Sequence, residues 1–265
     1  MIRIESPEDP RVEAFRDIRE RDLTGREGLF VAEGEVVLRQ LVSPASLCRP
    51  RALLLAEKRV SALADVIGVL PPGVPVYAAP QAVLDGIAGF HLHRGILALG
   101  EKPPTRPLEA LIDALAGRAL VVLACGIGNH DNIGGIFRNA AAFGADAVLL
   151  DRACCDPFYR KAIRVSVGAV LRTPMAVGLD PLQAVERLQA AGFETVAMTP
   201  GAARTLGEIA PANRVAVVLG AEGPGLPPAL IARCTPAAIR MSGGFDSLNV
   251  GTAGAIALHH FARRA

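Results

Sequence analysis

The chain has 265 residues, of which 51% are hydrophobic, and its 28 basic and 26 acidic side chains leave a formal net charge of +2. This hydrophobic content excludes an intrinsically disordered chain, and the length is enough for one large or two small folded domains. An excess of two positive charges is too small to attract nucleic acid by net charge, and 4% aromatic residues leave few rings for stacking bases. Composition by itself therefore predicts a soluble metabolic enzyme of the α/β class.

Membrane and disulfide classes are also excluded by the residue pattern. No apolar run approaches the roughly 18 residues of a membrane helix, and residues 1–25 are charged rather than signal-like. The five cysteines have no metal-ligand spacing, and a chain of this size needs no disulfide scaffold. We therefore expect a cytoplasmic protein with reduced cysteines, no metal site and no membrane partner.

The N-terminal half alternates short apolar runs with helical patterns. Residues 7–24 predict a polar helix with a solvated face. Four β-like runs follow at 29–34, 52–57, 74–79 and 95–100, and helical patterns lie between them at 36–42 and 81–89. This alternation predicts a small α/β domain over 1–100. The segment 101–107 contains three prolines and begins a predicted linker over 101–114.

The C-terminal half, 115–265, alternates more regularly. Nearly continuous apolar runs occur at 119–126, 145–151, 195–199 and 215–220, as in strands that are covered on both faces. Helical patterns lie at 132–143, 160–171 and 181–191, and a last helix runs from Thr252 towards the C-terminus. Strands that alternate with helices predict a parallel sheet.

Two nucleotide-binding motifs are considered for this half of the chain. Gly126 and Gly128 follow a predicted strand, but the third glycine of a dinucleotide fingerprint would stand at Asp131. Asp151 lies at the end of the next strand, which alone is a weak signal. No segment has the spacing of a phosphate-binding P-loop. Both interpretations are rejected.

Three glycine-marked segments, 126–144, 217–226 and 239–261, each follow a predicted strand, where open α/β sheets bind ligands. The first contains Asn132, Ile133, Gly134 and Arg138; the second Gly220, Glu222, Gly223, Gly225 and Leu226; the third Met241, Ser247, Leu248, Asn249 and Val250. Together they resemble the motifs of the SpoU (TrmH-type) RNA ribose 2′-O-methyltransferases of the SPOUT superfamily. The resemblance covers about 119–265, and the segment 161–170 is similar to the intervening helix of that family. The chain departs from the family pattern at 129–131 and 251–254, outside the motif side chains.

The resemblance implies an α/β architecture of two domains. The C-terminal domain, 115–265, would be an α/β knot, with a deep trefoil knot and a parallel sheet. The smaller N-terminal domain, 1–100, is similar at its edges to L30e-like domains that bind RNA. The resemblance also implies a homodimer.

The same resemblance implies transfer of a methyl group from S-adenosylmethionine to a ribose 2′-hydroxyl of rRNA or tRNA, without a metal. The implied catalytic residues are Asn132, Arg138, Glu222, Ser247 and Asn249. Those around the methyl donor are Leu219, Gly220, Glu222, Gly223, Ile239, Met241 and Leu248. RNA contacts would come from Arg138, Arg160, Lys161 and Arg164.

The acceptor hydroxyl is the difficult part of this chemistry, because it is barely ionised at neutral pH. A guanidinium with a pKa above about 12 is a poor general base. We therefore expect Arg138 to grip the adjacent phosphate and polarise the hydroxyl, with proton removal assisted by that phosphate or by Ser247. Deprotonation by Arg138 itself is the alternative. We expect the carboxylate of Glu222 to hold Asn132 or Arg138 in place.

Two other functions remain open at this point. One is a noncatalytic RNA-binding or assembly factor on the same fold, and the other is an enzyme of the superfamily that methylates a base atom. His130, His259 and His260 are expected to lie on loop or helix surfaces without a catalytic role. With a net charge of +2, RNA binding should depend on a few placed cations.

Overall fold

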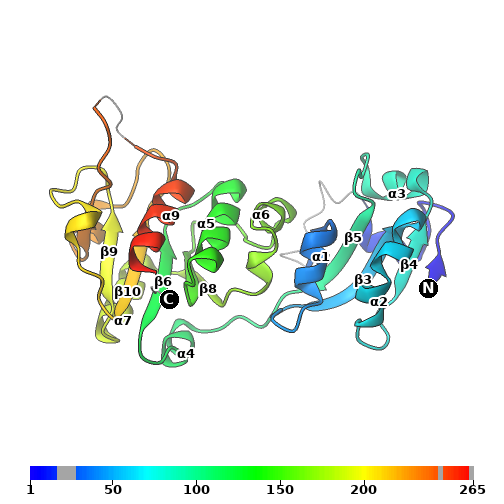
Figure 1. Ribbon diagram of the computed structural model, residues 1–265, viewed down its shortest axis with the longest axis horizontal. Helices are drawn as coiled ribbons and strands as arrows, with labels where there is room; N and C mark the ends of the chain where they lie inside the picture. Colours follow the sequence, from blue (N-terminus) through cyan, green and yellow to red (C-terminus); the bar gives the residue numbers. More distant parts are fainter. Residues whose placement is uncertain (17–27, 244–246, 263–265) are drawn as a thin grey trace. The chain divides into compact units, whose positions relative to one another are not determined.

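Two β-sheets organise the chain, and each belongs to its own unit of the computed structural model, which describes residues 1–16, 28–243 and 247–262 (Figure 1). Unit 1 comprises Met1–Pro103 and Phe158–Arg172, and unit 2 comprises Pro104–Pro157 and Thr173–Ala265. The segment Phe158–Arg172 thus groups with the N-terminal unit, although it lies within the range predicted for the C-terminal domain. No helix among these described residues is long and apolar enough to cross a membrane.

Unit 1 is built on a mixed five-stranded sheet. Its strands lie in the order β1 (Ile2–Arg3), β4 (Val76–Ala79), β3 (Arg49–Ala56), β5 (Ile96–Glu101) and β2 (Leu29–Glu33). Strands β1 and β3 run parallel to β4, whereas β5 runs antiparallel to both β3 and β2. The four predicted strands of the N-terminal half are confirmed, and β1 adds an edge that the sequence pattern does not reveal.

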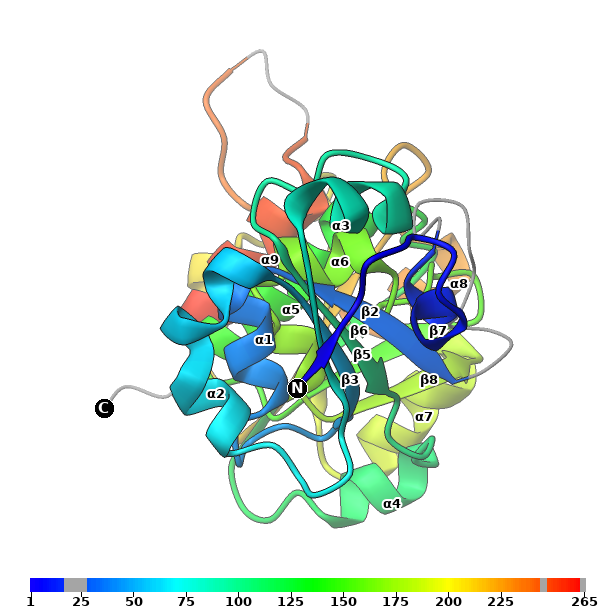
Figure 2. The ribbon, with the colours of Figure 1, turned by 90° about the vertical axis from the view of Figure 1, so that its right-hand side faces the viewer.

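Helices cover both faces of this sheet. Helix α3 (Gln81–Ala88) and the 3₁₀ helix η1 (Pro10–Phe15) pack on one core, and Figure 2 shows α1 (Glu35–Leu41) and α2 (Ala64–Gly68) on the side away from η1. The predicted helices at 36–42 and 81–89 are confirmed as α1 and α3. Two further 3₁₀ turns, η2 (Glu57–Arg59) and η3 (Ser61–Leu63), lead from β3 into α2.

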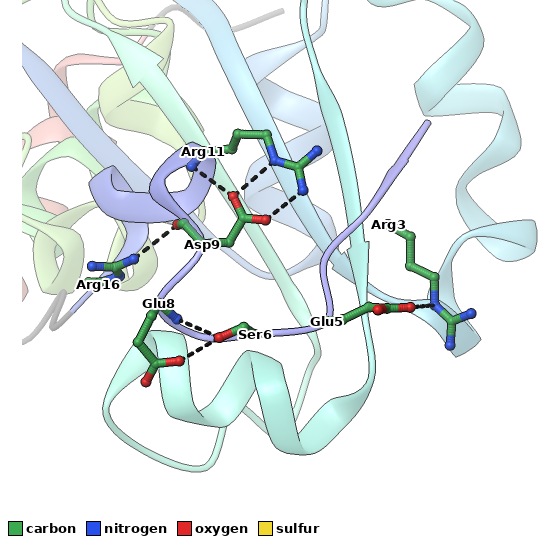
Figure 3. Close-up of polar contacts among 7 residues, drawn as sticks. All are labelled: Arg3, Glu5, Ser6, Glu8, Asp9, Arg11 and Arg16. Carbon is green, nitrogen blue, oxygen red and sulfur yellow. Dashed lines mark hydrogen bonds and ion pairs between the residues drawn. The ribbon is translucent and has the colours of Figure 1, made fainter.

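The predicted polar helix over 7–24 is wrong where the structure describes it. Residues Pro10–Phe15 form η1, Arg16 is extended, and 17–24 lie outside the described residues. Asp9 is the N-cap that starts η1, because its carboxylate accepts from the backbone N–H of Arg11 at 2.9 Å and from the Arg11 guanidinium (Figure 3). The helix ends at Arg16, whose backbone is extended. The Arg11 guanidinium and backbone N–H lower the pKa of Asp9 to about 2. Val12 and Phe15, three residues apart, are buried rather than solvated.

The segment Phe158–Arg172 completes unit 1. It contains α6 (Arg160–Val165) and η4 (Ala169–Leu171) instead of the single helix predicted over 160–171. The break lies at Val167, whose φ of 56° is disfavoured for a β-branched residue. Helix α6 packs against β2, where Arg160 Nη1 lies 2.5 Å from Glu33 Oε2.

Unit 2 is built on a six-stranded sheet in which every recorded pair is parallel. The strand order is β11 (Thr235–Ala237), β9 (Glu194–Met198), β10 (Arg214–Leu219), β6 (Ala119–Ala124), β7 (Ala147–Asp151) and β8 (Met175–Leu179). The predicted parallel sheet and its four inner strands are confirmed. The edge strands β8 and β11 were not predicted, because β8 is largely exposed and β11 has only three residues.

Helices cover both faces of the parallel sheet. Helix α5 (His130–Ala142) packs beside α9 (Val250–Phe261) on one face, as Figure 1 shows. Helices α4 (Leu108–Asp113) and α7 (Pro181–Ala190) share the core of the other face. Two short elements, η5 (Leu206–Glu208) and α8 (Pro228–Ile231), lie in the connections. Because α4 buries apolar side chains in this core, the predicted linker over 101–114 is folded in its second part.

Candidate active site

The three glycine-marked segments of the sequence converge at the carboxyl ends of the strands of unit 2. The first follows β6, the second follows β10, and the third leads from β11 into α9. Strands β6 and β10 are neighbours, and Cys125 N–H donates to Leu219 O at 2.8 Å where they end. The chain continues from β6 towards β7 on one side, while β9 and β11 lie on the other. This reversal of strand order creates the crevice in which open α/β sheets bind ligands.

Asn249 joins the three segments through its side-chain amide. Its Nδ2 donates to Asn132 Oδ1 at 2.8 Å and to Glu222 Oε1 at 3.0 Å. Its Oδ1 accepts from the backbone N–H groups of Gly251 at 2.9 Å and Thr252 at 3.3 Å, which makes Asn249 the N-cap of α9. One residue thus fixes the start of the last helix and connects it to the other two motifs.

The partners of Asn249 differ in their surroundings. Asn132, in the first turn of α5, is only 7% exposed, so its hydrogen bond is shielded from water. Glu222 is exposed and accepts from Asn249, rather than from Asn132 or Arg138 as the sequence suggested. We call the three side chains Asn132, Glu222 and Asn249 the amide junction.

The loop after β10 can be built only with glycine at its first position. A Cβ on Gly220 would lie 2.5 Å from the backbone carbon of Gly225 and from the nitrogen of Leu226. The loop closes on itself, because Gly225 N–H donates to Ala221 O at 3.0 Å. This tight turn holds Glu222 beside Asn249 and brings the loop backbone to the edge of a cavity.

The cavity has a volume of about 750 Å³ and lies at the carboxyl ends of β9, β10 and β11. Its lining includes all seven residues that the resemblance assigns to the methyl donor, namely Leu219, Gly220, Glu222, Gly223, Ile239, Met241 and Leu248. Ser247 and Asn249 also line it. Met198, Thr199 and Pro200, which follow β9, were not predicted, and their only signal in the sequence is their place after a buried strand.

Arg138 lies on α5, six residues after Asn132 and about 240° around the helix from it. Its side chain is exposed, and within the described part of the chain it forms no hydrogen bond or ion pair. The structure therefore brings Asn132, Glu222 and Asn249 into contact but does not bond Arg138 to them. An exposed guanidinium of this kind keeps all its donors for an anion.

Two further residues hold the site together and were not predicted. Asn139 Nδ2 donates to Gly251 O at 2.8 Å, which ties α5 to the first turn of α9. Asn139 follows Asn132 by seven residues, so the same face of α5 carries both, and this spacing was the available signal. Asp151, at the end of β7, accepts from the N–H groups of Gly126 and Ala153 at 3.0 Å and so fixes the loop before α5.

The residues Arg160, Lys161 and Arg164, which the resemblance assigns to RNA, lie on α6 in unit 1. Arg160 is engaged with Glu33 and also lies over the ring of Phe90, with its guanidinium carbon 4.9 Å from the ring centre. Lys161 and Arg164 are exposed.

The model of the SpoU rRNA methylase family matches residues 119–259, which is more than half of the chain and includes all the motif residues of the three segments. The chain belongs to the SpoU rRNA methylase family. This SpoU protein is 39% identical, over 97% of its length, to an uncharacterized tRNA/rRNA methyltransferase of Mycobacterium bovis, of which the match covers 90%.

Solved structures resemble the SpoU protein over nearly its whole length. An AdoMet-bound rRNA methyltransferase from Sinorhizobium meliloti matches with a TM-score of 0.81 at 24% identity, covering 97% of this chain and 96% of that one, which shows a shared fold. An RNA 2′-O ribose methyltransferase matches with a TM-score of 0.78 at 26% identity, covering 98% of this chain and 97% of that one. Both units of the protein therefore have structural counterparts in these solved proteins.

Proposed function

We propose that the protein transfers a methyl group from S-adenosylmethionine to a ribose 2′-hydroxyl of rRNA or tRNA. The observation that carries this proposal is the amide junction at the edge of the cavity, because it links three separate motifs by direct hydrogen bonds. The likeness to an RNA 2′-O ribose methyltransferase and to an AdoMet-bound rRNA methyltransferase supports the choice of acceptor and methyl donor.

The cavity fits S-adenosylmethionine in size and lining. Its volume of about 750 Å³ lies inside the range of roughly 300–1,000 Å³ for small-molecule sites. Apolar side chains such as Leu219 and Ile239 suit an adenine ring, while the loop 220–225 offers backbone groups for polar contacts. When bound, S-adenosylmethionine supplies a methyl group on a positively charged sulfur, which is already activated for attack by an oxygen.

The chain's own residues would act on the RNA acceptor. Arg138 would bind the phosphate next to the target ribose and polarise its 2′-hydroxyl, because the guanidinium is exposed and uncommitted within the described residues. Removal of the hydroxyl proton would be assisted by that phosphate or by a hydrogen bond to Ser247, which lines the cavity, and the proton would then pass to solvent. Asn249, fixed by Asn132 and Glu222, would keep the start of α9 in place while the acceptor is bound.

The remaining features of the family belong to the same proposal. Unit 2 would form the trefoil-knotted catalytic domain predicted over 115–265, with α4 of the predicted linker 101–114 packed on it and without Phe158–Arg172. Residues 1–100 of unit 1 would form an L30e-like domain that binds RNA. Lys161 and Arg164 would contribute phosphate contacts, while Arg160 would mainly hold α6 on Glu33. The protein would act as a homodimer, and Ile256 of α9, 39% exposed, suits such an interface.

The test is methylation of unmodified total RNA with labelled S-adenosylmethionine, followed by alkaline hydrolysis. A ribose 2′-O-methyl group blocks cleavage at its own nucleotide, so the label should appear in dinucleotides. Label in mononucleotides would mean base methylation and would contradict the proposed acceptor. Calorimetry with S-adenosylmethionine tests the other alternative, because a noncatalytic RNA-binding factor would bind no methyl donor.

A further inference from the structure

A second cavity lies within unit 1, at one end of its mixed sheet, and has a volume of about 660 Å³. It is lined by Glu35, Val36, Lys58, Arg59, His93, Arg94 and Ile96. Three adjacent strands meet there, since β2 ends at Glu33, β3 ends at Ala56 and β5 begins at Ile96. The residues that line this cavity lie at or next to these strand ends. We call it the basic cavity.

The loops of the basic cavity are held by backbone hydrogen bonds. Gly34 N–H donates to Ile96 O at 3.1 Å, and Ala56 N–H donates to Gly95 O at 2.8 Å. These hydrogen bonds join the three strand ends close to Lys58 and Arg94. A ligand that binds there would meet a largely preformed surface, which lowers the ordering cost of binding.

The charge of the basic cavity is strongly positive. Its lining contains three cations, Lys58, Arg59 and Arg94, and one carboxylate. With His93 neutral, the net charge of the lining is +2, which equals the net charge of the whole chain. That carboxylate, Glu35, is already neutralised, because its oxygens accept from Arg59 at 2.8 Å and from Arg39 at 3.0 Å. Lys58 and Arg94 are exposed and form no hydrogen bond or ion pair with any residue that the structure describes. Two cations are therefore available to an anion.

Arg94 is also positioned by its packing. A Cβ on Gly34 would lie 2.9 Å from Arg94 Nη1 and 3.0 Å from its Cδ, and Gly34 has a φ of +88°. The arginine side chain thus lies against the main chain at Gly34, whose positive φ favours glycine. The Arg94 side chain therefore starts from the rim of the basic cavity, which it lines.

We propose that the basic cavity binds the phosphodiester backbone of the RNA substrate, with Lys58 and Arg94 as direct phosphate ligands. Arg59 and Glu35 form the support on which these ligands rest. The inference rests on the proposed function, because it takes RNA as the substrate. A chain with a net charge of only +2 lacks a general attraction to RNA, so its phosphate contacts must come from local groups of cations such as this one.

The test compares two double variants of the full-length protein. Lys58→Ala/Arg94→Ala removes the two free cations of the basic cavity. Arg49→Ala/Arg51→Ala is the matched control, because it removes two exposed positive charges at the opposite end of β3. Binding of a short fluorescein-labelled RNA hairpin is measured by anisotropy at several KCl concentrations, and thermal unfolding of each variant checks the fold. Initial rates of methyl transfer at saturating S-adenosylmethionine give KM and kcat for RNA.

We expect the Lys58→Ala/Arg94→Ala variant to bind the hairpin about tenfold more weakly. The slope of the logarithm of its association constant against log [KCl] should be smaller in magnitude by about 1 to 2. Its KM for RNA should rise while kcat at saturating RNA is retained. The Arg49→Ala/Arg51→Ala variant should keep the hairpin affinity and the KM for RNA of the original protein. An equal loss in both variants would mean that binding follows net charge and would overturn the proposal, as would no loss in either.

Two further outcomes separate the possible failures. If the Lys58→Ala/Arg94→Ala variant loses affinity for inorganic phosphate but binds the hairpin as tightly as the original protein, the basic cavity is a site for free anions, and the RNA assignment is wrong. If the original protein methylates no RNA, the proposed function fails. The hairpin measurements would still decide whether the basic cavity binds RNA, because they do not depend on methyl transfer.

Discussion

The two units treat their polar side chains in opposite ways. In unit 2 the amide junction pairs its polar groups with one another, and they lie at the edge of a cavity lined by glycines and apolar side chains. In unit 1 the basic cavity leaves Lys58 and Arg94 without partners among the described residues. Paired groups fix a geometry, as a reaction requires, whereas unpaired cations retain their affinity for an external anion. The same chain thus combines a site built for position with a site built for charge.

The largest expected effect is on the stability of unit 1, and it tests whether the two units are independent. Phe15 is 1% exposed and packs with Val12 and α3 in the core of unit 1, so Phe15→Ala should lower its free energy of unfolding by about 3–5 kcal/mol. Hydrogen exchange followed by mass spectrometry should show faster exchange in unit 1 alone. Val69→Ala is the control, because Val69 is 63% exposed. Equal acceleration in unit 2 would mean that the units unfold together.

The next effect concerns the reaction. Arg138→Ala should lower kcat on the order of a hundredfold. The phosphate next to the target ribose would lose its contact with the guanidinium, and the 2′-hydroxyl would lose the charge that polarises it. Calorimetric binding of S-adenosylmethionine should remain unchanged. Arg152→Ala, which removes another exposed arginine of unit 2, should leave kcat close to the original value. Full turnover in Arg138→Ala would show that the guanidinium has no part in the reaction.

A smaller effect separates the two roles of Asn249. Asn249→Ala removes both the N-cap of α9 and the amide junction, which should cost about 1–2 kcal/mol of unfolding free energy. Asn249→Asp keeps an oxygen for the N–H groups of Gly251 and Thr252 but places a carboxylate against Glu222. Circular dichroism should show the helix retained in the aspartate variant, while methyl transfer falls as far as in the alanine variant. Normal activity of the aspartate variant would contradict a role for the junction.

The last prediction concerns the thiols beside the first loop of the site, whose perturbation affects no function proposed for the protein. Burial raises the pKa of Cys154 to about 12 and that of Cys155 to about 11, so at pH 8 almost no thiolate is present. Alkylation by iodoacetamide at pH 8 should be about a hundredfold slower in the native protein than in denaturant, and it should speed up as the pH rises. Peptide mass spectrometry measures both rates. Equally fast alkylation in the two states would mean that these thiols are accessible and unperturbed.

The inner strands and the order of the motifs could be predicted from the sequence because their signals are local. Continuous apolar runs marked β6, β7, β9 and β10, and glycines marked the loops that follow them. The edge strands β8 and β11 were not predicted, because few of their residues are buried and they therefore lack a continuous apolar run. The helix predicted over 7–24 failed for a different reason. Its charges suggested a solvated face, whereas Asp9 caps a short 3₁₀ helix that ends at Arg16, and Phe15 is buried in the core.

For this protein, the sequence by itself determined the parallel sheet of unit 2, the family and the residues that would line the site. Each of these depends on short patterns and on spacing along the chain. Only the tertiary structure decided which side chains touch, since Asn249 meets Asn132 across 117 positions of sequence. It also decided that Glu222 holds Asn249, that Phe158–Arg172 joins unit 1, and that cations from separate loops share one cavity. Such contacts are set by how strands order in a sheet, and no local pattern of residues encodes that order.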